Sequence, residues 1–261
     1  MPDPAAFLPA DATLLLWIGA VFLLAGTVKG AIGLGLPTVS LGLLAVTMDI
    51  RAAMALLLVP SFVTNIWQMA GGGQFMPLLR RLWPFLLCAS LSIWFGAAAL
   101  KTADAGALKA LLGALVIAYA LLGLMRPAWQ LPPRREAWAG PLAGIVNGVL
   151  TGLTGSFVVP GVLYLQSLGL GREALVQAMG MLFMASTVAL GLALGGRGLL
   201  PGELLGSSAL AVIPALAGMA AGRALRRRLS EAAFRRVFFI ALLLLGLYIA
   251  GRWLLAAPWL A

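Results

Sequence analysis

The chain has 261 residues, of which 62% are hydrophobic and 10% are charged. A water-soluble globule of this length needs more polar surface than this composition supplies, so the sequence predicts a protein that uses lipid as its solvent. The net charge of +10 comes from basic residues in short segments between apolar runs, which indicates membrane topology and contact with lipid head groups and argues against a nucleic-acid partner.

The first long apolar element, residues 14–46, is too long for one ordinary membrane helix, which takes about 20 residues. The string GAIGLGLP at residues 30–37 interrupts it with glycines and includes Pro37, which suits the first turn of a new helix because proline has no amide to pair there. An unpaired amide is costly in lipid, so such a break persists only where protein or a cavity covers it. We therefore expect a broken or re-entrant pair of helices in this element.

Three further apolar runs follow, at residues 52–70, 82–100 and 107–125, and each approaches the length that crosses a bilayer. They lack the alternation of apolar and polar residues that marks a membrane β-strand, so we expect helices. The next stretch, residues 126–136, is rich in both proline and charge and is predicted to be a linker.

The second half of the chain repeats this order. The string AGIVNG at residues 143–148 matches AGTVKG at residues 25–30, at an offset of 118 (143 minus 25). Arg172 opens an apolar run as Arg51 does, at an offset of 121 (172 minus 51). A second glycine string, GVLTGLTGS at residues 148–156, interrupts the element before that run.

We predict an all-α polytopic protein of the inner membrane, multi-pass, with two structural repeats. The first repeat occupies residues 12–126, the linker residues 127–137 and the second repeat residues 138–256. Each repeat is expected to contain a broken or re-entrant helix pair followed by about three spanning helices. An inverted arrangement places most arginines on the cytoplasmic side, whereas a parallel one spreads them over both sides, so the positive-inside rule favours inverted repeats.

The two glycine strings contain the candidate binding site, which we expect near the bilayer midplane between the repeats. Transporters with inverted repeats direct the N-terminal amides and positive ends of half-helices at an anionic substrate there. Asn65 and Ser186 stand at equivalent positions in the following spans, each 14 residues after its arginine (65 minus 51, 186 minus 172). The predicted substrate-binding residues are Lys29, Gly30, Gly33, Gly35, Asn65, Asn147, Gly152, Thr154, Gly155, Ser156 and Ser186.

Each of these features also has a structural interpretation. Glycines four residues apart, such as Gly26 and Gly30, suit close packing of helices through small residues. Lys29 can pair with a bound anion, as an intramembrane cation often does, but a lysine can also extend its ammonium group to the membrane surface. The amide and hydroxyl side chains can make hydrogen bonds between helices. The sequence alone leaves these alternatives open.

The chain lacks the residue types that several kinds of chemistry require. The sequence contains no histidine, a single cysteine, Cys88, and acidic residues only in predicted loops or helix ends. A proton relay through a buried carboxylate, a metal site and acid–base catalysis are therefore unsupported, and we predict neither an enzyme nor a cofactor. A pocket of amides, hydroxyls and one lysine prefers anions.

Four strings of this chain carry a resemblance to a known family. Two are the glycine-rich segments at residues 25–37 and 144–160, the second of which contains GxxxGLTG at 148–155. The other two open predicted helices: REA at 172–174 and FRR at 234–236. Together these strings resemble the TauE/SafE family of membrane anion transporters, often called sulfite exporters. The resemblance covers nearly the whole chain and implies transport of sulfite, sulfonates or related small anions across the inner membrane. The chain departs from the family pattern at Leu36-Pro37 and Ser156-Phe157, where additional glycines or prolines are expected in many relatives.

We therefore expect a secondary transporter for a small sulfur-containing or organic anion, with that anion and the membrane lipids as its partners. The alternative is an integral membrane subunit that recruits a partner without transporting a solute itself. Anion flux through the purified chain distinguishes the two.

Overall fold

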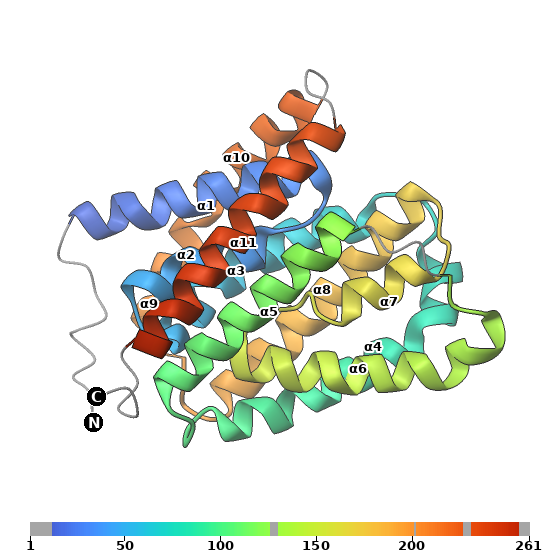
Figure 1. The fold of residues 1–261 in the computed structure, drawn as a ribbon, viewed down its shortest axis with the longest axis horizontal. Coiled ribbons are helices and arrows are strands. Elements are labelled where there is room, and N and C mark those ends of the chain that lie inside the picture. The colour runs from blue at the N-terminus through green and yellow to red at the C-terminus, as the bar shows by residue number, and fades with distance from the viewer. Residues whose placement is uncertain (1–11, 126–129, 201, 227–230, 256–261) are drawn as a thin grey trace. The chain divides into compact units, whose positions relative to one another are not determined.

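The computed structural model describes residues 12–125, 130–200, 202–226 and 231–255, and its regular structure over these ranges is entirely helical (Figure 1). The helices are α1 (Ala12–Ile32), α2 (Leu36–Thr47), α3 (Ile50–Ala70), α4 (Phe75–Ala99), α5 (Ala105–Met125), α6 (Pro133–Thr154), α7 (Gly161–Ser167), α8 (Arg172–Gly195), α9 (Gly202–Leu210), α10 (Val212–Arg226) and α11 (Glu231–Leu255).

Seven helical segments within the described ranges are long and apolar enough to cross a membrane. They are α1, α3, α4, α5, α8, the segment Leu204–Arg226 that joins most of α9 to α10, and α11. The chain is therefore a multi-pass membrane protein of the all-α class. Three of these segments follow the α1–α2 pair and three follow the α6–α7 pair, which is the order that the sequence predicts.

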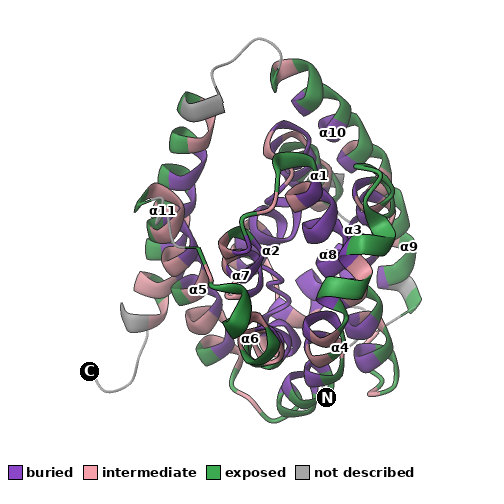
Figure 2. Ribbon diagram, turned by 90° about the vertical axis from the view of Figure 1, so that its right-hand side faces the viewer, coloured by how far each residue is buried: buried purple, intermediate pink, exposed green. Residues whose placement is uncertain are grey.

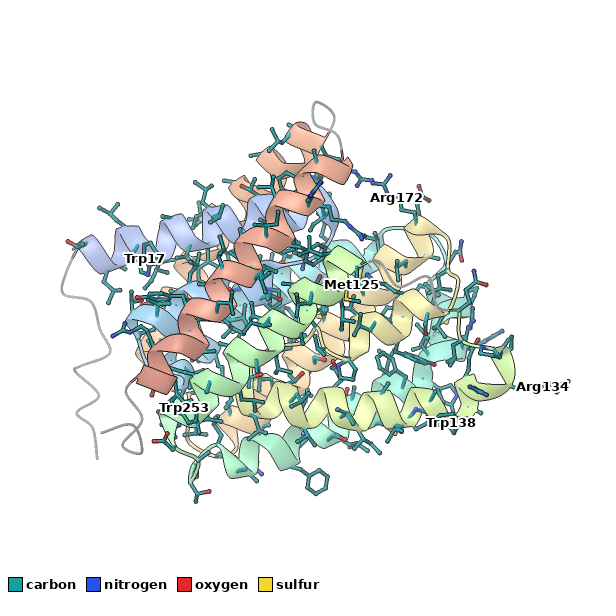
Figure 3. All side chains as sticks on the ribbon, viewed as in Figure 1. Trp17, Met125, Arg134, Trp138, Arg172 and Trp253 are labelled. Carbon is teal, nitrogen blue, oxygen red and sulfur yellow. The ribbon has the colours of Figure 1, made fainter. Side chains whose placement is uncertain are left out.

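Basic and aromatic side chains lie near the ends of several helices. Figure 3 shows Trp17 near the start of α1, Arg134 and Trp138 at the start of α6, Arg172 at the start of α8 and Trp253 near the end of α11. Tryptophan and arginine favour the interface between lipid and water, because that interface accommodates both an apolar body and a polar tip. Their positions agree with membrane-spanning helices.

The chain forms two compact units. One comprises residues 1–60, 104–124 and 198–261, and we call it the α1 unit; the other comprises residues 61–103 and 125–197, and we call it the α6 unit. Each unit contains segments from both halves of the sequence. The units and the predicted repeats are thus different divisions of the chain, and the repeat boundaries stay a prediction.

In the α1 unit, α1 packs against α10 through glycines on both helices (Figure 2). A Cβ atom at Gly26 or Gly30 would collide with the carbonyl oxygen of Ala215 or Met219, respectively. From the other side, a Cβ at Gly222 would collide with the carbonyl oxygen of Thr27. The two backbones approach this closely only because these positions have no side chain, as in small-residue helix pairs in membranes.

In the α6 unit, α6 packs against α4 in the same way. A Cβ atom at Gly148 or Gly152 would collide with the carbonyl oxygen of Ala89 or Ile93, and one at Gly96 with that of Val149. The structural interpretation of the four-residue glycine spacing, close helix packing, is therefore confirmed for Gly26, Gly30, Gly148 and Gly152.

The two helix pairs make similar contacts. Gly26 and Gly148 each face a carbonyl oxygen of the partner helix, as do Gly30 and Gly152, and the members of each pair are 122 residues apart (148 minus 26, 152 minus 30). Gly144, which the offset of 118 pairs with Gly26, also faces such an oxygen, that of Phe85. The alignment of the two halves therefore stays a prediction.

A proline inside α3 leaves one backbone carbonyl without its helical hydrogen bond, and a serine of α9 supplies the bond instead. Pro60 has no N–H, so the carbonyl of Leu56, four residues earlier, loses its helical partner. Ser208 of α9 donates its hydroxyl to this carbonyl at 2.8 Å, and its oxygen accepts the N–H of Val59 at 3.1 Å. One serine therefore satisfies two polar backbone groups beside the proline, which lipid cannot do.

We expect Ser208→Ala to destabilise the folded protein by about 1–3 kcal/mol, because the Leu56 carbonyl stays buried without a partner. Ser90→Ala is the matched control, since the Ser90 hydroxyl only adds a bond to the carbonyl of Leu86 in its own helix. Unfolding of both variants in mixed detergent micelles measures the difference. Equal stability of the two variants would contradict this account of the hydrogen bonds beside Pro60.

Candidate functional site

The α1 unit contains the first helix break, which lies where the sequence predicts it. Helix α1 ends at Ile32 and α2 begins at Leu36. Gly33 and Gly35 between them have φ values of 78° and 101°, a left-handed conformation that glycine adopts without the steric cost other residues bear. Pro37 stands in the first turn of α2, as predicted. The glycines therefore allow the chain to reverse between two helices within a few residues.

The first turn of α2 presents a polar group with no partner. Thr38 is 1% exposed, and its hydroxyl oxygen has no hydrogen-bond partner among the described residues. The first intrahelical bond of α2 runs from the Val39 N–H to the Gly35 carbonyl at 2.8 Å. The amides before Val39 belong to the helix start, where N–H groups have no intrahelical acceptor and the helix dipole is positive. A hydroxyl and the positive end of a helix thus meet at the break.

Lys29 lies in the last turn of α1, and the Gly33 N–H bonds to its carbonyl at 2.8 Å. Its side chain is 3% exposed, and it is the only buried charged side chain within the described residues. A lysine that extends its ammonium group to the membrane surface would be exposed at its tip, whereas Lys29 is enclosed by protein. The burial favours the interpretation of Lys29 as an internal cation.

The α6 unit contains the second break. Helix α6 ends at Thr154, Gly155 has a φ of 73°, and α7 begins at Gly161. The Thr154 hydroxyl donates to the Leu150 carbonyl at 2.7 Å and accepts the Ser156 N–H at 3.2 Å. The Thr151 hydroxyl donates to the Ser156 carbonyl at 2.9 Å. These hydroxyl protons stabilise the turn itself, and a role for Thr154 and Ser156 in binding stays a prediction.

Three buried amide and hydroxyl side chains lie in the same unit as this second break. Asn147 of α6 accepts the Gly161 N–H on its Oδ1 at 3.0 Å. Asn65 of α3 donates its Nδ2 to the Thr187 hydroxyl of α8 at 3.2 Å, and Ser186 precedes Thr187. Asn65, Asn147 and Ser186 are each 0% exposed.

The structure thus distributes the predicted site residues over the two units. Lys29, Gly30, Gly33 and Gly35 meet at the α1–α2 break, and the other seven, from Asn65 to Ser186, lie in the α6 unit. Gly30 and Gly152 serve as helix contacts, and their role in binding stays a prediction. The structure adds Thr38 to the candidate residues. Its position directly after Pro37, in the first turn of the predicted half-helix, is the signal that could have identified it.

Sequence comparison identifies the family of the chain. The family model described as sulfite exporter TauE/SafE matches residues 18–249, well over half of the chain. No curated protein and no solved structure matches the chain. The chain therefore belongs to the TauE/SafE sulfite exporter family, whose members are transporters and not enzymes.

Proposed function

We propose that this chain is a secondary transporter that moves a small sulfur-containing anion, such as sulfite or a sulfonate, across the inner membrane. The α1–α2 break is the proposed anion site, with Lys29, Gly33, Gly35 and Thr38 as its residues. Family membership supports an anion of the sulfite type, and the polar groups at the break support its location.

The observation that carries the proposal is the burial of Lys29 beside a helix start. A buried positive charge attracts a small anion strongly, because little water screens it. The Thr38 hydroxyl and the N-terminal amides of α2 can donate to the oxygen atoms of that anion. The site is therefore complementary to a small oxyanion.

Flux of radiolabelled sulfite into proteoliposomes that contain the purified chain tests this proposal. We expect saturable uptake that unlabelled sulfite competes away and that liposomes without protein lack. Absence of flux from folded, correctly inserted protein, with flux restored only by a co-expressed second protein, would support the alternative of a recruiting subunit.

We further propose that the two halves are inverted repeats. The α1–α10 and α6–α4 pairs support this, because their contacts match. Residues of α1 and α6 with matching contacts are 122 apart, and those of α4 and α10 are 126 apart: Gly222 contacts Thr27 as Gly96 contacts Val149 (149 minus 27, 222 minus 96). Each half also has one broken pair followed by three long apolar segments. The arginine distribution supports the inverted orientation over the parallel one.

Thiol labelling in a Cys88→Ser background tests the orientation. We expect Arg135→Cys at the start of α6 and Arg226→Cys at the end of α10 to react from the cytoplasmic side, because inverted repeats place both there. Lys101→Cys, between α4 and α5, should react from the opposite side. All three side chains are exposed. A membrane-impermeant maleimide applied to intact cells and to inside-out vesicles gives the answer, and finding residues 135 and 226 on opposite faces would eliminate the inverted model.

A further inference from the structure

The α6 unit contains two buried hydrogen-bond donors that the fold leaves unused. The Nδ2 of Asn147 and the Oγ of Ser186 have no hydrogen-bond partner among the described residues, and both side chains are 0% exposed. A buried donor without an acceptor is costly, and in lipid no water from outside compensates for it. Two such groups beside one helix break indicate a ligand that accepts hydrogen bonds.

The orientation of the Asn147 amide is fixed by its other contact. The N–H of Gly161 can only donate, so the atom of Asn147 that faces it at 3.0 Å is the acceptor Oδ1. The NH₂ group of the amide therefore points away from Gly161, and its two protons are available. Asn147 holds the start of α7 with one end and offers donors with the other.

Ser186 likewise does not bond to its own helix. The neighbouring Thr187 donates to the Phe183 carbonyl at 2.6 Å, which is the usual local bond of a helical hydroxyl. Ser186 makes no such bond, so its proton is free for another acceptor. The Ser186 hydroxyl can thus donate a hydrogen bond to a ligand, whereas the Thr187 hydroxyl already donates to its own helix.

Contacts of α8 bring Ser186 to the same break as Asn147. A Cβ atom at Gly161 would lie 2.6 Å from the Asn147 Oδ1 and 2.8 Å from the Leu182 side chain, one helical turn before Ser186. The rings of Phe157, within the break, and Phe183 of α8 have centroids 6.3 Å apart. The break is therefore packed between the helix that carries Asn147 and the turn of α8 that leads to Ser186.

We propose that Asn147 Nδ2 and Ser186 Oγ form a second oxyanion position, in the α6 unit, that holds sulfite or sulfonate oxygen atoms with neutral donors alone. This inference rests on the proposed function. The charged side chains of the unit lie outside the buried set, so an anion here gains hydrogen bonds without an ion pair and binds more weakly than at Lys29. A transported anion must leave as well as enter, and a weak neutral position suits release.

Calorimetric titration of the purified full chain with sulfite tests the second position. In a Lys29→Met background, which removes the charged site, we expect weak residual binding. Adding Ser186→Ala should weaken this residual binding by about tenfold or more, the equivalent of about 1.4 kcal/mol. Asn147→Asp should do the same, because the carboxyl group keeps the acceptor for Gly161 and loses the NH₂ donor. The matched control is Ser92→Ala, since the Ser92 hydroxyl is satisfied by the Cys88 carbonyl at 2.6 Å.

The outcomes separate the two proposals. A Ser186→Ala chain that binds sulfite as the Ser92→Ala chain does overturns the second position, and so does a complete loss of binding in Lys29→Met alone. Either result leaves the transporter proposal intact. A wild-type chain that binds no sulfite overturns both. Thermal unfolding without ligand accompanies each variant, so that loss of binding is attributed only to folded protein.

Discussion

Lys29→Met should weaken the tighter sulfite binding of the purified chain by at least tenfold, or about 1.4 kcal/mol. An ion pair at 4 Å in surroundings with an effective dielectric constant of about 20 is worth about 4 kcal/mol before the cost of desolvation is subtracted, so a net loss of this size is reasonable. Methionine retains most of the apolar stem and removes the charge. Sulfite flux in proteoliposomes should fall with the affinity.

Stability separates a binding lysine from a structural one. Lys29→Met should lose the stabilisation that sulfite gives the wild type, because a ligand stabilises only a chain that binds it. A structural lysine would show the opposite pattern, with lower stability in the absence of sulfite and unchanged affinity.

Lys29→Arg is the second arm of this experiment. It keeps the positive charge, but the guanidinium group is larger and planar, and Gly30 beside it is packed against the Met219 carbonyl. We expect partial retention of binding. Equal sulfite dissociation constants for wild type, Lys29→Met and Lys29→Arg would remove Lys29 from the site and leave Thr38 and the glycine break as its residues.

Local features of this fold could be predicted from the sequence. The helix breaks at Gly33 and Gly155, the new helix at Pro37 and the long apolar segments all follow from the conformational preferences of single residues or from length. Each depends on a stretch of chain shorter than one helix. Such features do not depend on which other helices pack against them.

Features that depend on a partner helix could not be predicted in this way. Gly144, Gly148 and Gly152 repeat every four residues, and only the structure shows that a Cβ at any of the three would meet a carbonyl oxygen of α4. The unsatisfied state of Thr38 and Ser186 has the same origin. Whether a hydroxyl finds an acceptor depends on what packs around it, and no local pattern encodes that.

The close approach of α1 and α10 leads to the prediction with the largest effect on folding. A methyl group at Gly26 would overlap the Ala215 carbonyl oxygen, and that oxygen belongs to backbone that cannot rotate away as a side chain can. Gly26→Ala must therefore separate the two helices, which removes van der Waals contact along the whole seam where lipid offers no hydrophobic compensation. Overpacking of this kind costs about 1–3 kcal/mol, and a rigid backbone contact places it at the upper end.

Gly19→Ala, in the same helix, is the matched control for Gly26→Ala. A Cβ atom at Gly19 meets nothing within 4 Å, so the added methyl group should have no steric cost, and it should favour the helix by up to about 1 kcal/mol because alanine is the better helix former. The two variants make the same chemical change seven residues apart, and only the contact with α10 differs. We expect the midpoint of unfolding to fall for Gly26→Ala and to stay or rise for Gly19→Ala in the same micelles. If both substitutions shift the midpoint equally, the α1–α10 seam is looser than the glycine contacts require, and the alignment of the two halves that rests on it is lost as well.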